Sequence, residues 1–270
     1  MVGSKLPLGG LGLLFTSGAL VLLFFIILSG VSNVTPFKNT YFLQADTSGI
    51  TGAKDITRWT YFYMCDENNL NCAGPWPAPP FGYAWSGGAS GVPDGLAGPH
   101  GRDTTSKFYF YMWRFGWVFY MISLFFVAMA WFASFLACCG RLGSAIAALV
   151  AATGLFFLTI AVSLMTCVQA FLTDNLPNVR PPANVSSATF VKARDAFLAA
   201  GRDASVGRYA FGFGWGAWAA LLIATVLFGL GIRSDRSGGG GGGRSWRRRK
   251  STRSRRSYDV GSRRVKDDYS

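Results

Sequence analysis

Two cysteines, Cys65 and Cys72, are the residues whose type and spacing most clearly allow a reaction. They enclose six residues, so oxidation of the two thiols in an oxidising compartment would close a short turn. In chain-entropy models a disulfide around so short a loop adds on the order of 2–3 kcal/mol to stability. We expect the two cysteines to form a disulfide, and two free thiols are the alternative.

Patterns that indicate catalysis are scarce. The only histidine, His100, lies in a loop rich in glycine and proline, and the sequence contains no HExxH motif and no phosphate-binding loop. Asp46 and Asp55 could pair with Arg58 or bind a cation, and structural pairing is the expected role. The sequence therefore predicts a protein that is not an enzyme, with no catalytic residues, no metal site and no cofactor.

The C-terminal tail carries a dense basic cluster behind a run of six glycines, Gly238 to Gly243. Glycine-rich linkers are flexible, and each basic residue near a membrane gains about 1 kcal/mol from anionic cytoplasmic lipids. We therefore expect the tail to bind phosphoinositide-rich membrane, and the alternative is that it only fixes the topology. The lipid-binding residues would be Arg247, Arg248, Arg249, Lys250, Arg253, Arg255 and Arg256.

Four hydroxyl side chains are interleaved with this cluster and are candidates for phosphorylation: Ser251, Thr252, Ser254 and Ser257. Two phosphates would cancel about three to four positive charges. Phosphorylation is therefore expected to release the tail from anionic lipid.

The composition indicates a membrane protein. Half of the residues are hydrophobic, 16% are aromatic, 14% are charged and the mean hydropathy is +0.28, whereas soluble domains have about a quarter of their residues charged. Four apolar runs are long enough to cross a bilayer, and none contains Asp, Glu, Lys, Arg or His, which argues against a charge-lined transport route. The runs are residues 9–31, 116–138, 144–171 and 209–232.

The basic residues predict the orientation of these spans. Thirteen Lys or Arg residues against four acidic residues follow Ile232, and Arg141 lies in the short loop 139–143. The positive-inside rule places that loop and both termini, residues 1–8 and 233–270, in the cytoplasm. Loops 32–115 and 172–208 would then be extracellular. The first run could instead be a cleaved signal peptide, but its apolar core is longer than usual for one.

Two kinds of modification fit this topology. Asn33 and Asn184 begin N-x-Ser/Thr triplets in the extracellular loops and are glycosylation candidates, and Asn184 is the better acceptor because Asn33 lies close to the membrane. Cys138 and Cys139, at the cytoplasmic end of the second run, are palmitoylation candidates, with ordinary interfacial packing as the alternative.

The first extracellular loop reads as a small antiparallel sheet. Residues 41–43 and 59–63 are rich in residues that favour strands, and residues 46–52 carry turn chemistry. In the second loop, residues 190–198 have helical periodicity, and we expect a short helix that lies against the first loop and ends at Gly201. The predicted fold is an all-α membrane protein, a four-helix transmembrane bundle with a small disulfide-pinned extracellular β-sheet.

The first loop resembles the fungal SUR/PalI family of four-span plasma-membrane proteins, the membrane components of eisosome domains. The resemblance rests on the run FLQADTSGI, on RWTY with the cysteine pair, and on KFYFYMWRFGWVFYMI at the second span. The motif residues are Phe42, Leu43, Asp46, Thr47, Ser48, Gly49, Arg58, Trp59 and Thr60. The layout is more distantly similar to claudins, although the claudin Gly-Leu-Trp triplet is absent, which argues against a junction-like barrier or pore.

This resemblance implies a protein of immobile, furrow-like plasma-membrane patches that supports cortical, cell-wall and lipid organisation. The resemblance implies eisosome proteins as partners, while the basic tail predicts binding to anionic phosphoinositides. Sterol or sphingolipid and a second copy of the chain are further expected partners, and no nucleic acid is expected. One alternative is a PalI-like sensor or chaperone subunit in ambient-pH signalling. Another is a channel or transporter subunit.

Overall fold

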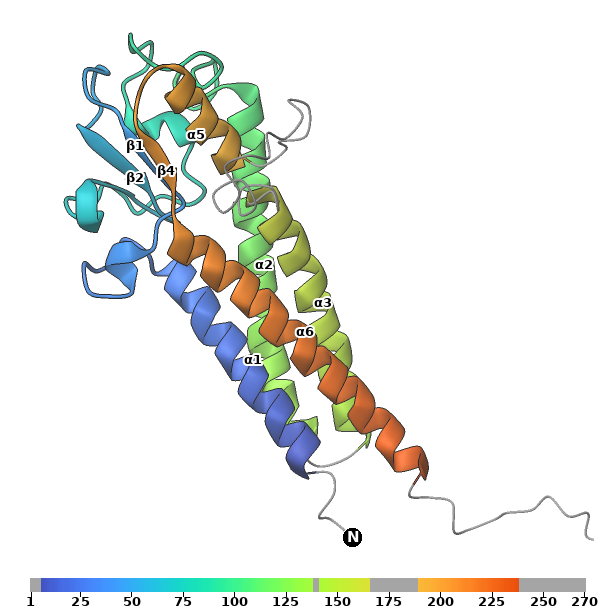
Figure 1. Ribbon diagram of the computed structural model, residues 1–270. Helices are drawn as coiled ribbons and strands as arrows, with labels where there is room; N and C mark the ends of the chain where they lie inside the picture. Colours follow the sequence, from blue (N-terminus) through green and yellow to red (C-terminus); the bar gives the residue numbers. More distant parts are fainter. Residues whose placement is uncertain (1–5, 138–140, 166–188, 238–270) are drawn as a thin grey trace, which may run out of the picture.

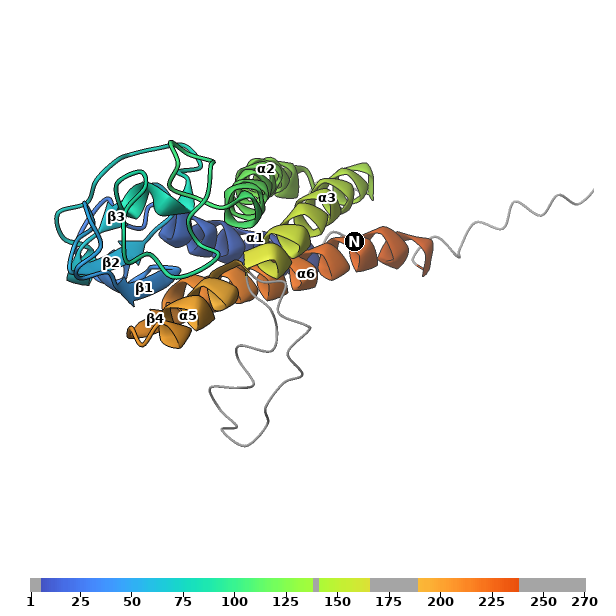
Figure 2. The same cartoon turned by 90° about the horizontal axis from the view of Figure 1, so that it is seen from above.

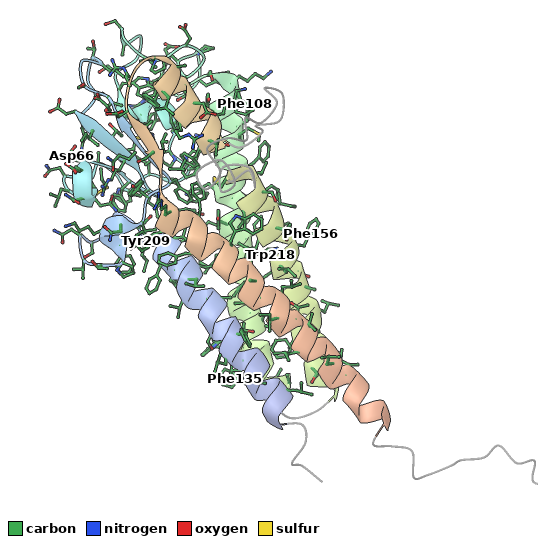
Figure 3. All side chains as sticks on the ribbon, in the orientation of Figure 1. Asp66, Phe108, Phe135, Phe156, Tyr209 and Trp218 are labelled. Atoms are coloured by element: carbon green, nitrogen blue, oxygen red, sulfur yellow. A yellow bond between two sulfur atoms is a disulfide. The ribbon has the colours of Figure 1, made fainter. Side chains whose placement is uncertain are left out.

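Four long helices form one elongated bundle (Figure 1). The computed structural model describes residues 6–137, 141–165 and 189–237. Each long helix is long and apolar enough to cross a membrane, and Phe135 and Phe156 point outward from the bundle (Figure 3). The four-helix bundle predicted from the sequence is therefore confirmed. The helices are α1 (Leu6–Ile27), α2 (Lys107–Ala137), α3 (Arg141–Met165) and α6 (Arg208–Ser237).

Two helix ends differ from the apolar runs. Helix α1 ends at Ile27 rather than at residue 31, because Ser29 turns back to donate to the Ile26 carbonyl (2.6 Å) and Gly30 takes a left-handed φ of +85° that favours glycine. Helix α2 begins at Lys107, nine residues before Gly116, and so extends about 14 Å further. The extension is helical because it buries Tyr109 and Trp113 against the rest of the protein.

Small residues let the helices approach within the molecule. A Cβ atom at Gly12 of α1 would collide with the Phe228 ring of α6, and one at Gly214 would lie 2.8 Å from the Tyr120 hydroxyl of α2. Gly212 and Gly216 are spaced four residues apart on α6. A Cβ atom at Gly216 would lie 3.2 Å from Leu22 of α1, whereas one at Gly212 would meet no described atom within 4 Å. The close packing of α6 therefore depends on Gly214 and Gly216.

Side-chain hydrogen bonds also connect the helices. Trp131 of α2 donates to Ser17 of α1 (2.9 Å), and Trp218 of α6 donates to Thr159 of α3 (2.9 Å). Because lipid offers no hydrophobic drive for helix association, close packing and such hydrogen bonds are what hold a bundle together.

A four-stranded antiparallel sheet lies at one end of the bundle (Figures 1 and 2). Its order is β3-β2-β1-β4, and Leu43 of β1 lies opposite Trp59 in β2 and Val206 in β4. The first loop supplies the first three strands, so the predicted antiparallel sheet in this loop is confirmed, but the two predicted strand segments, 41–43 and 59–63, overlap the observed strands only at Leu43 and Trp59. Strand β4 belongs to the second loop and was not predicted. The strands are β1 (Leu43–Asp46), β2 (Ile56–Trp59), β3 (Met64–Cys65) and β4 (Ala204–Val206).

The helix predicted in the second loop is confirmed as α5 (Thr189–Ala199). It ends with Gly201 at a φ of +74°, where Gly201 N–H donates to the Leu198 carbonyl and Arg202 N–H to the Phe197 carbonyl, both at 3.0 Å. This pair of bonds is the Schellman motif, which satisfies the last carbonyls of a helix. Phe190 of α5 stacks on Phe42 with ring centroids 5.2 Å apart, so α5 packs against the first loop as predicted.

Candidate functional site

The disulfide between Cys65 and Cys72 is formed, and it closes the loop that holds the 3₁₀ helix η2 (Glu67–Asn69). Asn69 in this loop is buried, and its amide donates to the Phe37 carbonyl (2.8 Å) and to the Thr40 carbonyl (3.2 Å). The disulfide loop is therefore fixed to the 3₁₀ helix η1 (Phe37–Asn39), which follows α1. Sequence analysis did not single out Asn69, because nothing in its local pattern identifies a distant carbonyl as its partner.

Arg58 is buried beside the same segment. Its Nε donates to Gln44 Oε1 (2.7 Å), its Nη1 donates to the Lys38 carbonyl (3.2 Å), and its guanidinium lies over the Tyr41 ring, 4.5 Å from the centroid. Burial lowers the pKa of Arg58, and the nearby Tyr41 and Glu67 oppose that effect. The sequence suggested pairing of Arg58 with Asp46 or Asp55, but these hydrogen bonds go instead to an amide and a backbone carbonyl.

The other motif residues of the first loop build a turn. Asp46 accepts a hydrogen bond from the Ser48 N–H (2.9 Å), and the hydrogen bonds from Ser48 lower the pKa of the Asp46 carboxyl. Thr47 Oγ1 donates to the Lys54 carbonyl (2.6 Å) and lies 2.7 Å from Thr57 Oγ1. Gly49 has a φ of +73°. The turn predicted for residues 46–52 is thus held by its own side chains.

Trp59 is the centre of the aromatic packing on β2. It is 2% exposed, it stacks on Phe81 with centroids 4.7 Å apart, and its indole N–H donates to the Phe81 carbonyl (2.9 Å). Phe81 begins the 3₁₀ helix η3 (Phe81–Ala84), and Trp85 after it donates to the Thr104 carbonyl (3.0 Å). The glycine- and proline-rich part of the first loop therefore lies against the sheet.

The turn between β2 and β3 attaches the sheet to two long helices. The Tyr61 hydroxyl donates to the Trp117 carbonyl in α2 (2.7 Å), and the Tyr61 N–H donates to Ser29 Oγ just beyond α1 (3.2 Å). Burial raises the pKa of the Tyr61 hydroxyl far above its usual value, so Tyr61 remains a neutral donor. The strand predicted over residues 59–63 ends at Trp59 because residues 60–63 form this turn.

Arg202 connects the two loops at the end of β4 farthest from α6. Its guanidinium donates to the Ser48 carbonyl (2.7 Å) and, at 3.4 Å each, to the carbonyls of Asp46 and Gly91. Arg202, near the end of the second loop, therefore holds two turns of the first loop in place.

The remaining candidates that the structure describes do not gather into a reactive site. His100 lies against Phe110 and Tyr111, with centroids 5.1 and 5.7 Å away, and Asn33 is exposed. Within residues 6–137, 141–165 and 189–237, no group of three or more His, Cys, Asp or Glu side chains could hold a metal ion. The candidates that lie outside the described residues are Cys138, Cys139, Asn184, the seven basic residues of the tail and its four phosphorylation candidates.

Comparison with known proteins identifies the same family from a family model and from individual relatives. The model of the SUR7/PalI family matches residues 8–185. "SUR7 family protein FMP45" of Saccharomyces cerevisiae is 34% identical over 206 residues, which cover 75% of this chain and 59% of that protein. "Protein SUR7" of Candida albicans is 29% identical over 225 residues, which cover 83% of this chain and 73% of that protein.

A third relative, "Uncharacterized plasma membrane protein YNL194C" of Saccharomyces cerevisiae, is 30% identical over 212 residues, or 76% of this chain and 62% of that protein. The chain thus spans less than two thirds of the length of FMP45 and of this relative. No solved structure gives a significant match.

Proposed function

This chain belongs to the SUR7/PalI family, and on that basis we propose that it is a non-enzymatic organiser of plasma-membrane domains in a fungal cell. In this role it would occupy eisosome-type cortical patches and support cell-wall and lipid organisation. Family membership is the observation that carries the proposal. One relative, YNL194C, is named as a plasma-membrane protein, which supports the location.

The architecture is suited to such a role. The sheet is attached to α1 and α2 through Tyr61 and to the second loop through β4 and Arg202. A body fixed at several points cannot tilt freely on the helices, so it presents a constant surface at one side of the membrane. An organiser that aligns neighbouring components needs such a surface.

We place the sheet outside the cell and both termini in the cytoplasm. The Cys65–Cys72 disulfide supports this orientation, because disulfides persist in oxidising compartments. The basic tail would then meet the anionic cytoplasmic leaflet, where its seven clustered cations would bind phosphoinositide-rich patches. Eisosome proteins, sterol or sphingolipid, and a second copy of the chain are the further partners we propose.

The test is the behaviour of the tagged full-length protein in fungal cells. We expect immobile cortical patches that recover slowly after photobleaching. Replacing the seven tail cations, Arg247 to Arg256, by glutamine should speed recovery, whereas replacing the exposed Arg114 on the sheet side should not. An even distribution of the wild-type protein would contradict the proposal.

A second candidate follows from the family description, which also includes PalI. A PalI-like sensor or chaperone subunit would act in ambient-pH signalling. Two results together would favour this candidate over the organiser. They are an even distribution of the tagged protein over the plasma membrane and loss of the alkaline-pH response in cells that lack the protein.

A further inference from the structure

The segment that follows α1, residues 28–39, exposes apolar side chains next to a membrane span. We call this segment the foot. Leu28, Val31 and Val34 are 40%, 57% and 63% exposed. Residues 28–37 contain no charged side chain. Single exposed apolar residues are ordinary, but several in one short uncharged segment mark an interaction surface.

The foot turns back along α1 instead of rising directly to the sheet. Phe37 packs edge-on against Phe25 of α1 with ring centroids 5.7 Å apart, and Phe25 in turn lies 5.5 Å from Phe213 of α6. Phe25 belongs to the candidate span Leu8–Ile27, so Phe37 lies at the depth of the last turns of that span. In Figure 1 the loop of the foot lies beside the ends of α1 and α6, below the sheet, and Figure 3 labels Tyr209 at the start of α6 in the same region.

The backbone of the foot is held in this place by strand β2 and by the disulfide loop. Arg58 donates to the Lys38 carbonyl, and Asn69 donates to those of Phe37 and Thr40. At the other end, a Cβ atom on Gly30 would lie 2.6 Å from Thr60 Oγ1, so the chain is closely packed there too. Backbone carbonyls that already have donors lose less when they leave water for a less polar layer.

We propose that the foot inserts Val31 and Val34 into the boundary between headgroups and acyl chains of the leaflet nearest the sheet. The ligand is bilayer lipid, contacted through apolar surface that continues the lipid-facing surface of α1. The foot carries one cation, Lys38, whereas the inserted side chains, Val31 and Val34, are apolar. The insertion therefore rests on burial of apolar surface and does not require anionic headgroups. Asn33 lies between the two valines, within the headgroup layer, and therefore does not carry a glycan although it begins an acceptor triplet.

The first test measures depth in the membrane. Full-length protein with Cys138, Cys139 and Cys167 replaced by serine is placed in vesicles, and an environment-sensitive fluorophore is attached through Val34→Cys. The matched control is Ser90→Cys, an exposed position beside Gly91, which contacts Arg202 at the end of β4 farthest from α6. We expect a shallow spin-labelled lipid to quench position 34 several-fold more than position 90, equally in neutral and anionic vesicles.

Equal access of aqueous iodide to positions 34 and 90 would overturn the proposal, as would insertion that occurs only in anionic vesicles.

A second measurement needs no added label in the foot. In an Asn184→Gln variant made in fungal cells, mass spectrometry of the Asn33 peptide should find no glycan. A glycan on Asn33 would show that the foot stands in water and would contradict the insertion.

Discussion

Replacing Trp59 with alanine is expected to cost about 3–5 kcal/mol of stability, as for other buried tryptophans. The substitution removes the stack on Phe81, the hydrogen bond to the Phe81 carbonyl, and the edge contact with Trp85, whose centroid is 6.4 Å away. Since these contacts hold the glycine- and proline-rich part of the first loop, that part should detach from the sheet. Near-ultraviolet circular dichroism and thermal unfolding of the full-length protein in nanodiscs would measure the loss.

Trp59→Phe is the matched control. Phenylalanine retains an aromatic ring against Phe81 but loses the indole N–H. Loss of that hydrogen bond should lower the stability by about 1 kcal/mol, and the smaller ring should lower it slightly further. If Trp59→Ala were no worse than Trp59→Phe, the aromatic stack would not be what fixes the loop.

Arg58→Leu is expected to have the second large effect, about 1–3 kcal/mol, because it leaves the Lys38 carbonyl and Gln44 Oε1 without the donor that they share. Leucine keeps part of the buried bulk, so the loss reports mainly the hydrogen bonds and the contact with Tyr41. Since Arg58 holds the foot, protease cleavage within residues 31–39 should become faster, as measured on the same full-length protein.

Arg114→Leu serves as the comparison for Arg58→Leu. Arg114 also lies over an aromatic ring, that of Phe110 at 4.3 Å, but it is exposed. Surface substitutions of this kind usually change stability by less than about 0.5 kcal/mol. Equal effects of the two leucine variants would show that Arg58 has no special structural role.

The motif that identified the family in the sequence turns out to have a structural role in this chain. Asp46 and Thr47 stabilise the turn after β1, Arg58 and Trp59 hold two separate segments against β2, and Thr60 begins the turn that docks on α1 and α2. These side chains therefore bond to groups within the chain. A motif of this kind specifies the geometry of the sheet.

What could be predicted from the sequence was local. The four spans, the disulfide and α5 have signals within a short window: apolar length, cysteine spacing and helical periodicity. Strand β4 has only three residues, Ala-Ser-Val, which are too few for their alternation to mark a strand. Its pairing with β1 depends on contacts across more than 150 residues of chain, as in the bond from Arg202 to the Ser48 carbonyl.

The partners of Arg58 and Asn69 could not be predicted for a related reason. Both side chains bond to backbone carbonyls, which every residue carries, so the sequence cannot distinguish the carbonyl that is used. Hydropathy likewise does not separate Leu28 and Val31 from the end of α1, although both lie beyond the helix. The foot is visible only once the helix end and the contact between Phe25 and Phe37 are known.

The most direct test of the proposed organisation is the accessibility of two introduced cysteines in intact fungal cells. Ser90→Cys lies on the sheet side of the membrane, and Ser270→Cys lies at the end of the basic tail. A membrane-impermeant maleimide should label position 90 in intact cells and position 270 only after permeabilisation. If both positions were labelled from the same side of the membrane, the sheet and the basic tail could not lie on opposite sides. That result would contradict the proposed topology, in which the sheet is outside the cell and the tail is in the cytoplasm.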